Sequence, residues 1–149
     1  MFGSLVKQYH LGQTVAQADW LIGADIVGPE LAPALRSMKA PGTANRHDVQ
    51  PADMDHYLHT STDSGGVHTN SGIPNHAFYV TSTTLGGQAW DAPGNIWYDA
   101  LLDPKMTHKS TFALFAGVTL RHARSRYGVG SNEAQAVQAG WEAVKVRVR

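Results

Sequence analysis

Residues 110–144 read STFALFAGVTLRHARSRYGVGSNEAQAVQAGWEAV, and this stretch decides the fold class. Apolar residues recur in it at the spacing of one helix face, in two stripes with a glycine between them. A serine precedes each stripe as a candidate N-cap, Ser110 for the first and Ser131 for the second. The stripes are Phe112, Phe115, Ala116, Thr119 and Ala123, then Ala134, Val137, Trp141 and Val144. We therefore predict two amphipathic helices here.

More helices are predicted upstream. Asn70 or Ser71 precedes an apolar stripe that ends at a Gly-Gly pair, and Asp91 precedes another that ends at Pro104. A further stripe runs through Phe2–Tyr9, although no capping side chain stands before it. A helix that begins without a cap looks like one cut in its middle.

The N-terminal third is predicted to be rich in loops, because prolines and glycines interrupt residues 29–53. Short helical segments are expected at Gln13–Trp20, Ala32–Met38 and Asp53–His59, and only Val144–Val148 alternates as a strand would. The predicted fold class is all-α, a helical bundle with a loop-rich N-terminal third.

The composition excludes several classes of protein. With 149 residues, 42% hydrophobic and 16% charged, the chain has the size of one domain and not the character of a disordered tail. Basic and acidic residues number 12 each, and no basic cluster interleaves with aromatic residues, so we expect no nucleic-acid partner. No apolar run approaches the roughly 18 residues of a membrane span, so we expect no membrane partner.

Cysteine is absent, which excludes disulfides and thiolate metal sites. The first residues show no signal-peptide pattern, and the compartment stays open.

A Gly-Gly turn presents a histidine just before a predicted helix, in the segment DSGGVHTNSGIPN at 63–75. Paired glycines adopt backbone angles that other residues avoid, and so fix the direction of His68. Asp63, across the turn, is placed to accept a hydrogen bond from the imidazole, which would fix its tautomer and favour the protonated ring. We interpret His68 as a general acid or oxyanion stabiliser. The alternative is a loop histidine beside an incidental aspartate.

Two other arrangements have weaker support. His56 and His59, with Asp53 and Asp55 beside them, have a spacing that one helical turn could aim at a metal. The simpler interpretation is a polar surface. A catalytic triad with Ser71 as nucleophile is disfavoured, because Ser71 would cap a helix and no nucleophile-elbow pattern surrounds it.

The segment GGVHTNSGIPNHAFY at 65–79 resembles the stretch of thermolysin-like zinc metalloendopeptidases that carries an active-site histidine. Other segments similar to the C-terminal domain of that family are FGSLVKQY at 2–9, ADW at 18–20, ALRSMKAPG at 34–42 and MDHY at 54–57. FGSLVKQ and RSMKAPG look closest to the protealysin branch. The resemblance covers essentially the whole chain and implies that residues 1–149 form a single thermolysin-like C-terminal α-helical domain.

The resemblance implies roles for four residues. His68 would hydrogen-bond the tetrahedral intermediate, and Asp63 would orient His68. Arg36 would hold a substrate carbonyl on the leaving-group side of the scissile bond, and Leu35 would line the pocket for a large hydrophobic side chain. Without the resemblance, Arg36 is better interpreted as a solvated or loop-bracing arginine.

The family also needs zinc, held by the two histidines of HExxH and by a glutamate just before the FGSL helix, with the glutamate of HExxH as general base. No histidine here is followed by glutamate, and the three glutamates, Glu30, Glu133 and Glu142, lie far from the expected position. We therefore expect zinc in the parent family enzyme but no metal ligand in this chain. The N-terminal zinc-binding half is expected to be absent and the isolated chain to be catalytically incomplete.

Calcium is not expected either. The resemblance places a double calcium site where this chain has Lys7 and Ala24, with Asp19 remaining. A lysine ammonium at that position can take the place of the divalent charge.

Two functions follow from these observations. The first is a C-terminal cleft domain of a metalloendopeptidase that hydrolyses peptide bonds before large hydrophobic residues, with a peptide or protein substrate and a missing N-terminal catalytic domain as partners. The second is a non-enzymatic helical module, derived from such a peptidase, that binds peptides or a partner. It could also form a homodimer through the exposed interdomain face.

Overall fold

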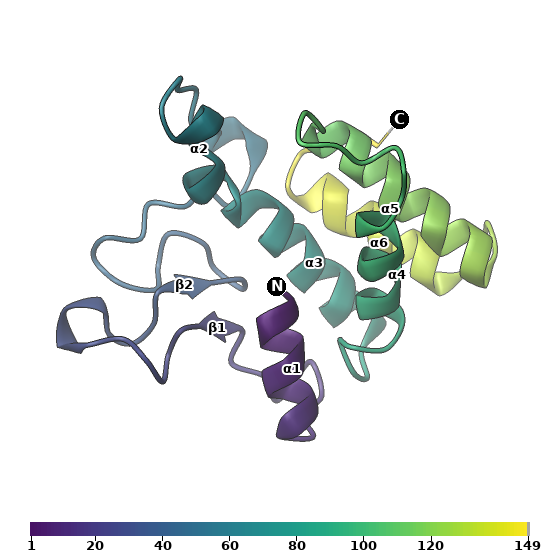
Figure 1. Cartoon of the computed structure of the whole chain (residues 1–149). Coiled ribbons are helices and arrows are strands. Elements are labelled where there is room, and N and C mark those ends of the chain that lie inside the picture. Colours follow the sequence, from purple (N-terminus) through teal and green to yellow (C-terminus); the bar gives the residue numbers. More distant parts are fainter. Residues whose placement is uncertain (149) are drawn as a thin grey trace.

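A computed structural model describes residues 1–148 and confirms the all-α class (Figure 1). Four helices of the second half pack together: α3 against α6, α6 against α5, and α5 against α4. Their bounds are α3 Gly72–Leu85, α4 Ala92–Leu101, α5 Phe112–Tyr127 and α6 Asn132–Ala143. Upstream lie α1 Phe2–His10 and the short, kinked α2 Asp63–Asn70.

The helix starts agree with the sequence patterns except in three details, one of which is that Asp91 occupies the N-cap position of α4 but its side chain makes no cap bond. Ser131 caps α6 as predicted, with its hydroxyl accepting from the backbone N–H of Ala134. The cap of α5 is Thr111 and not Ser110, because the Ser110 hydroxyl instead accepts from the N–H of Thr107 and closes the preceding turn. Ser71 occupies the N-cap position of α3, but its hydroxyl donates to the His68 carbonyl and makes no cap bond.

Buried tryptophans organise the core between the helices. The rings of Trp97 on α4 and Trp141 on α6 stack with centroids 6.1 Å apart, and the Trp141 indole donates to Thr119 on α5 at 2.8 Å. Where α6 crosses α3, a Cβ on Gly140 would lie 2.2 Å from Thr81 Oγ1, so only glycine permits this approach.

The N-terminal third differs from the sequence prediction in places. Gln13–Trp20 forms turns and no helix, because the Gln17 side chain accepts from both the N–H and the hydroxyl of Thr14 and stabilises a turn. The segment predicted as a helical turn at Ala32–Met38 instead contains β2 (Arg36–Ser37), which pairs antiparallel with β1 (Leu21–Ile22).

The other short segments show one agreement, at Asp53–His59, and two differences. A 3₁₀ helix, η1 (Pro29–Leu31), precedes β2, and the helical turn predicted within Asp53–His59 is the 3₁₀ helix η2 (Met54–His56). Val144–Val148 forms no strand, because no strand among residues 1–148 pairs with it. Val144 and Val146 are instead buried against the helices.

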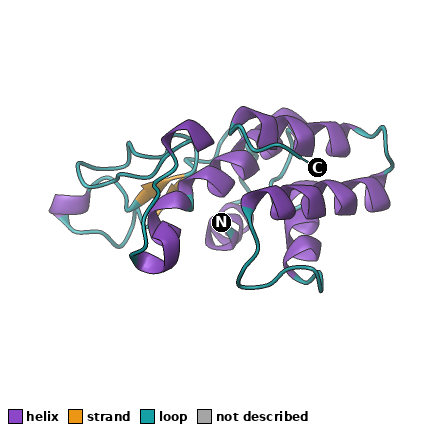
Figure 2. Cartoon of the chain, turned by 90° about the horizontal axis from the view of Figure 1, so that it is seen from above, coloured by secondary structure: helices purple, strands orange, loops and turns teal. Residues whose placement is uncertain are grey.

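Seen from above, the loops and the two strands gather at one end of the molecule and the helices of the second half at the other (Figure 2). Among residues 1–148, we find no helix with the length and apolar character needed to cross a membrane. The segment with His68, α2, lies on the side of the loops and strands and leads directly into α3 (Figure 1).

Candidate functional site

The residues before His68 form one turn of left-handed helix. Four consecutive residues have positive φ: Asp63 at 52°, Ser64 at 50°, Gly65 at 86° and Gly66 at 75°. Glycine adopts this conformation without strain, whereas each other L-residue costs roughly 1–2 kcal/mol. The glycines were visible in the sequence, but the left-handed Asp63 and Ser64 were not predicted.

This turn brings Asp63 against His68 through two contacts. One carboxylate oxygen lies 2.5 Å from the imidazole Nδ1, and the other accepts from the His68 backbone N–H at 2.9 Å. A carboxylate only accepts, so Nδ1 carries a proton and Nε2 points away from Asp63. The His68 side chain is 84% exposed, so Nε2 is accessible to a ligand.

The same contacts perturb the acid. The hydrogen bond from the His68 ring, followed by the bond from its backbone N–H, lowers the pKa of Asp63 below the usual value for aspartate. Asp63 therefore stays ionised at lower pH than an ordinary aspartate, and it continues to orient His68 there.

Arg36 lies on β2, near the loop-rich end of the molecule, and is held in place by its own loop. Its Nη1 donates to the Leu35 carbonyl at 2.8 Å and lies 3.9 Å from the buried carboxylate of Asp48. Asn45 donates to the carbonyls of Ala34 and Leu35. The guanidinium is half-buried and Leu35 is exposed, so both are available at the surface.

The structure offers no metal centre within the part of the chain it describes. Residues 1–148 contain no group of three or more histidine or acidic side chains that could hold a metal ion. His56 Nδ1 lies 2.9 Å from Asp53, and the Lys145 ammonium bridges Asp53 and Asp55. A cation is already neutralising the two aspartates, and this arrangement does not favour a divalent ion there.

Lys7 occupies the position where the resemblance placed an acidic calcium ligand. Its ammonium lies 2.7 Å from Asp19 and 3.8 Å from Asp25. The hydrogen bond to Asp19 raises the pKa of Lys7 above its usual value. The predicted exchange of a divalent ion for an ammonium is consistent with this geometry and remains a prediction.

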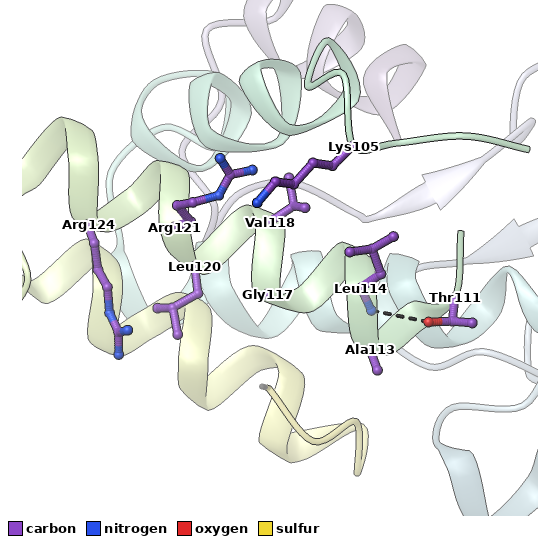
Figure 3. A pocket seen from close by; sticks show the side chains of 9 residues that line it. All are labelled: Lys105, Thr111, Ala113, Leu114, Gly117, Val118, Leu120, Arg121 and Arg124. Atoms are coloured by element: carbon purple, nitrogen blue, oxygen red, sulfur yellow. Dashed lines mark hydrogen bonds between the residues drawn. The ribbon is translucent and has the colours of Figure 1, made fainter. Parts of the chain in front are cut away.

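Two features were not predicted from the sequence. Asp103, just after α4, accepts from the Lys105 N–H at 2.9 Å and contacts Arg121 and His122 on α5. The second is a groove of about 620 Å³ over α5, lined mainly by apolar residues and by Lys105, Arg121 and Arg124 (Figure 3). None of the four residues proposed from the resemblance lines this groove.

With this geometry in place, the comparisons identify the class: residues 1–146 match the thermolysin metallopeptidase family, α-helical domain, and the chain belongs to that family. Over its whole length it is 48% identical to an extracellular metalloprotease of Pectobacterium carotovorum subsp. carotovorum, of which it covers 44%. It is 37% identical to thermolysin of Alicyclobacillus acidocaldarius over 98% of its length, covering 27% of that protein.

A solved structure agrees with the fold. The precursor of protealysin, a metalloproteinase from Serratia proteamaculans, superposes with a TM-score of 0.92 at 50% identity, covering 98% of this chain and 47% of that one. The chain thus spans less than half the length of these relatives. The predicted family and fold are confirmed, and zinc dependence is a property of this family.

Proposed function

We propose that this chain supplies the helical side of the active-site cleft in a zinc metalloendopeptidase. The observation that carries the proposal is the paired contact of Asp63 with His68, on a left-handed turn that leaves the ring exposed. Backbone strain of this kind persists where a site requires a fixed geometry. The substrate would be a peptide or protein with a large hydrophobic residue after the scissile bond.

His68 would act as an electrostatic stabiliser. When the ring is doubly protonated, Nδ1–H stays bound to Asp63 and Nε2–H is free to donate. Its target would be the oxyanion that forms on the scissile carbonyl when water adds. Arg36 would hold a carbonyl on the leaving-group side, and Leu35 would contact the neighbouring hydrophobic side chain.

The residues described do not fit a zinc site, so zinc and the general base would have to come from other residues. In this family zinc activates the attacking water. The proposed partner is therefore a zinc-binding half with the HExxH motif, and the isolated chain is expected to be inactive.

The test is a chimera. The N-terminal portion of the Pectobacterium relative, to which this chain is 48% identical, would be fused to residues 1–149. We expect zinc-dependent cleavage of a peptide with leucine or phenylalanine after the scissile bond, and none from the chain alone. His68→Ala in the chimera should lower kcat by about 10²–10³-fold, as loss of an oxyanion donor does.

His10→Ala is the matched control, because His10 is exposed at the end of α1 and is not one of the four residues proposed for the site. It should leave kcat within a few-fold of the parent chimera. Turnover by the chain alone with added zinc would contradict the proposed incompleteness. Equal activity of the His68→Ala chimera would contradict the role of His68.

A second candidate function, a partner-binding module, is favoured by the α5 groove. Eight of the twelve lysines and arginines lie after Asp103, but only two of the twelve acidic residues do. Among residues 1–148, no carboxylate lies within ion-pair distance of Lys105 or Arg124 on the groove rim. A groove with an apolar floor and a cationic rim fits an acidic amphipathic helix.

Fluorescence anisotropy with a labelled acidic amphipathic peptide tests this candidate. Binding should weaken with added salt and with Arg124→Glu. Arg126→Glu is the control, because Arg126 pairs with Asp99 and does not line the groove. Equal loss in both variants would indicate attraction by net charge and would contradict a defined groove site.

A further inference from the structure

We propose that Gln50 is a positioning residue that fixes the separation between the loop with Arg36 and the turn with His68. This inference rests on the proposed function, because it concerns the spacing of the same two site residues. Arg36 and His68 come from segments far apart in sequence, and a site works only when such groups are held within about half an ångström.

The Gln50 side chain is attached to the His68 side of the site by both of its amide protons. Its Nε2 donates to the His68 carbonyl at 2.8 Å and to the Ser71 hydroxyl oxygen at 2.8 Å. The Ser71 hydroxyl donates in turn to the His68 carbonyl at 3.0 Å, which closes a triangle of three hydrogen bonds. Gln50 is only 5% exposed, so water competes little for these bonds.

On the other side, Gln50 belongs to the loop that braces Arg36. Asp48, whose side chain is fully buried, accepts from the N–H groups of Gly42, Ala44 and Gln50 at 3.1, 3.2 and 3.3 Å. The same carboxylate lies 3.9 Å from the Arg36 guanidinium. A continuous set of polar contacts therefore runs from Arg36 through Asp48 and Gln50 to His68.

Two glycines show how tightly this segment is enclosed. A Cβ on Gly72, at the start of α3, would lie 2.5 Å from the Pro51 carbonyl oxygen and 2.8 Å from the Gln50 Cβ. A Cβ on Gly42 would lie 2.9 Å from the Gln50 carbonyl oxygen. The backbone at 50–51 is thus packed tightly between the loop and the start of α3. The Gln50 side-chain amide adds hydrogen bonds to this contact.

One other hydrogen bond joins the same regions and provides a comparison. His76 Nδ1 on α3 lies 3.0 Å from the Met38 carbonyl, beyond β2. It holds the segment after the strand to the first half of α3, whereas Gln50 holds the loop to the backbone of His68 itself. The proposal assigns the spacing of the two site residues to Gln50 and not to His76.

The absence of cysteine makes a direct distance measurement straightforward. Lys39→Cys and Val67→Cys, both at exposed positions, place nitroxide labels on either side of the contact for electron paramagnetic resonance. Gln50→Met keeps a side chain of similar size but removes both donors. We expect the distribution of label distances to become about twice as broad at temperatures where the protein stays folded.

The controls separate positioning from general stability. Gln138→Met removes an exposed amide that donates to Glu142 on α6, and should leave the distribution unchanged. A label pair at Thr84→Cys and Gln135→Cys, on α3 and α6, should keep its width in every variant. Gln50→Glu, which retains size and polarity without the two N–H donors, repeats the test if Gln50→Met does not fold.

An unchanged distribution in a folded Gln50 variant would overturn the proposal, even if the melting temperature fell. Broadening with His76→Ala but not with Gln50→Met would also overturn it. The measurement needs no metal, peptide or second domain. An inactive chimera with an intact distance effect would therefore count against the proposed function alone, and an active chimera without the effect against Gln50 alone.

Discussion

The carboxylate of Asp63 holds one residue through two of its atoms, the ring nitrogen and the backbone N–H of His68. Loss of that carboxylate should release the tautomer as well as the direction of the ring. The neutral His68 ring is expected to carry its proton on Nδ1, and Asp63→Ala should shift the population toward the Nε2–H form. Imidazole ¹⁵N chemical shifts report this directly, with His10 as an internal reference. Identical His68 shifts in both proteins would contradict the role assigned to Asp63.

The left-handed turn gives a second prediction at this scale. Ser64→Val places a β-branched side chain at φ 50° and should lower the free energy of unfolding by about 1–2 kcal/mol. Ser64→Gly should not destabilise, because glycine accepts this conformation. Ser125→Val, on the exposed face of α5, is the control and should cost no more than about 0.7 kcal/mol. Chemical denaturation measures these free energies of unfolding. Equal losses for Ser64→Val and Ser125→Val would contradict backbone strain at position 64.

Single residues also show what sequence could and could not predict about the site. Asp63 and His68 were predicted as a pair because a Gly-Gly turn separates them and a close contact needs only local geometry. Asp48 and Gln50 were not predicted as site residues. Their partners lie on other segments, and nothing in the local pattern distinguishes them from other polar loop residues.

At the scale of elements, the closest helix contact depends on one missing side chain. Gly140→Ala on α6 should destabilise by about 1–3 kcal/mol, because the added Cβ would lie 2.2 Å from Thr81 Oγ1. The same change at Gly3 on α1, where a Cβ meets nothing within 4 Å, should instead stabilise by about 0.5–1 kcal/mol. Thermal unfolding of the two variants provides the measurement, and shifts of the same sign would contradict this account.

Asp103 joins the end of α4 to α5, and its contribution should depend on pH. The bond from the Lys105 N–H, then those from His122 and Arg121, lowers the pKa of Asp103 to about 2. A carboxyl whose folded pKa is depressed stabilises the protein above its unfolded pKa, near 4, and loses that contribution as pH falls toward 2.

Asp103→Asn should therefore lower the melting temperature at neutral pH, and the difference from the parent should shrink between about pH 4 and pH 2. Asp91→Asn is the control, because the exposed Asp91 side chain makes no cap bond at the start of α4. If the difference in melting temperature between Asp103→Asn and the parent stayed constant across this range, it would contradict the stabilising role of the ionised Asp103.

The helices themselves were predictable because apolar spacing and capping residues act locally. The segments with errors were those whose conformation depends on distant partners. Ala32–Met38 contains β2 because Leu21–Ile22 pairs with Arg36–Ser37, and Val144–Val148 stays irregular because no strand among residues 1–148 pairs with it. Tertiary contacts overrode weak local preference in both places.

For the whole molecule, the ion pair between Lys7 and Asp19 joins α1 to the segment before β1. Calcium should leave the melting temperature of this protein unchanged. It should raise the melting temperature of Lys7→Glu, because the new carboxylate would join those of Asp19 and Asp25. Lys109→Glu lies outside this cluster, and calcium should not change its melting temperature. If calcium raised the melting temperature of the unmodified protein relative to a sample with chelator, it would contradict the replacement of calcium by the Lys7 ammonium.

The uneven distribution of charge has a consequence for how the molecule behaves on a resin. Its net charge is zero at pH 7, which alone predicts no retention on either type of ion exchanger. Yet α5, the segment before it and the segment after α6 are rich in cations, while most carboxylates lie earlier in the chain. An uneven distribution of charge lets a molecule of zero net charge present differently charged regions to a surface. At neutral pH and low salt, it should be retarded by cation and anion exchangers alike.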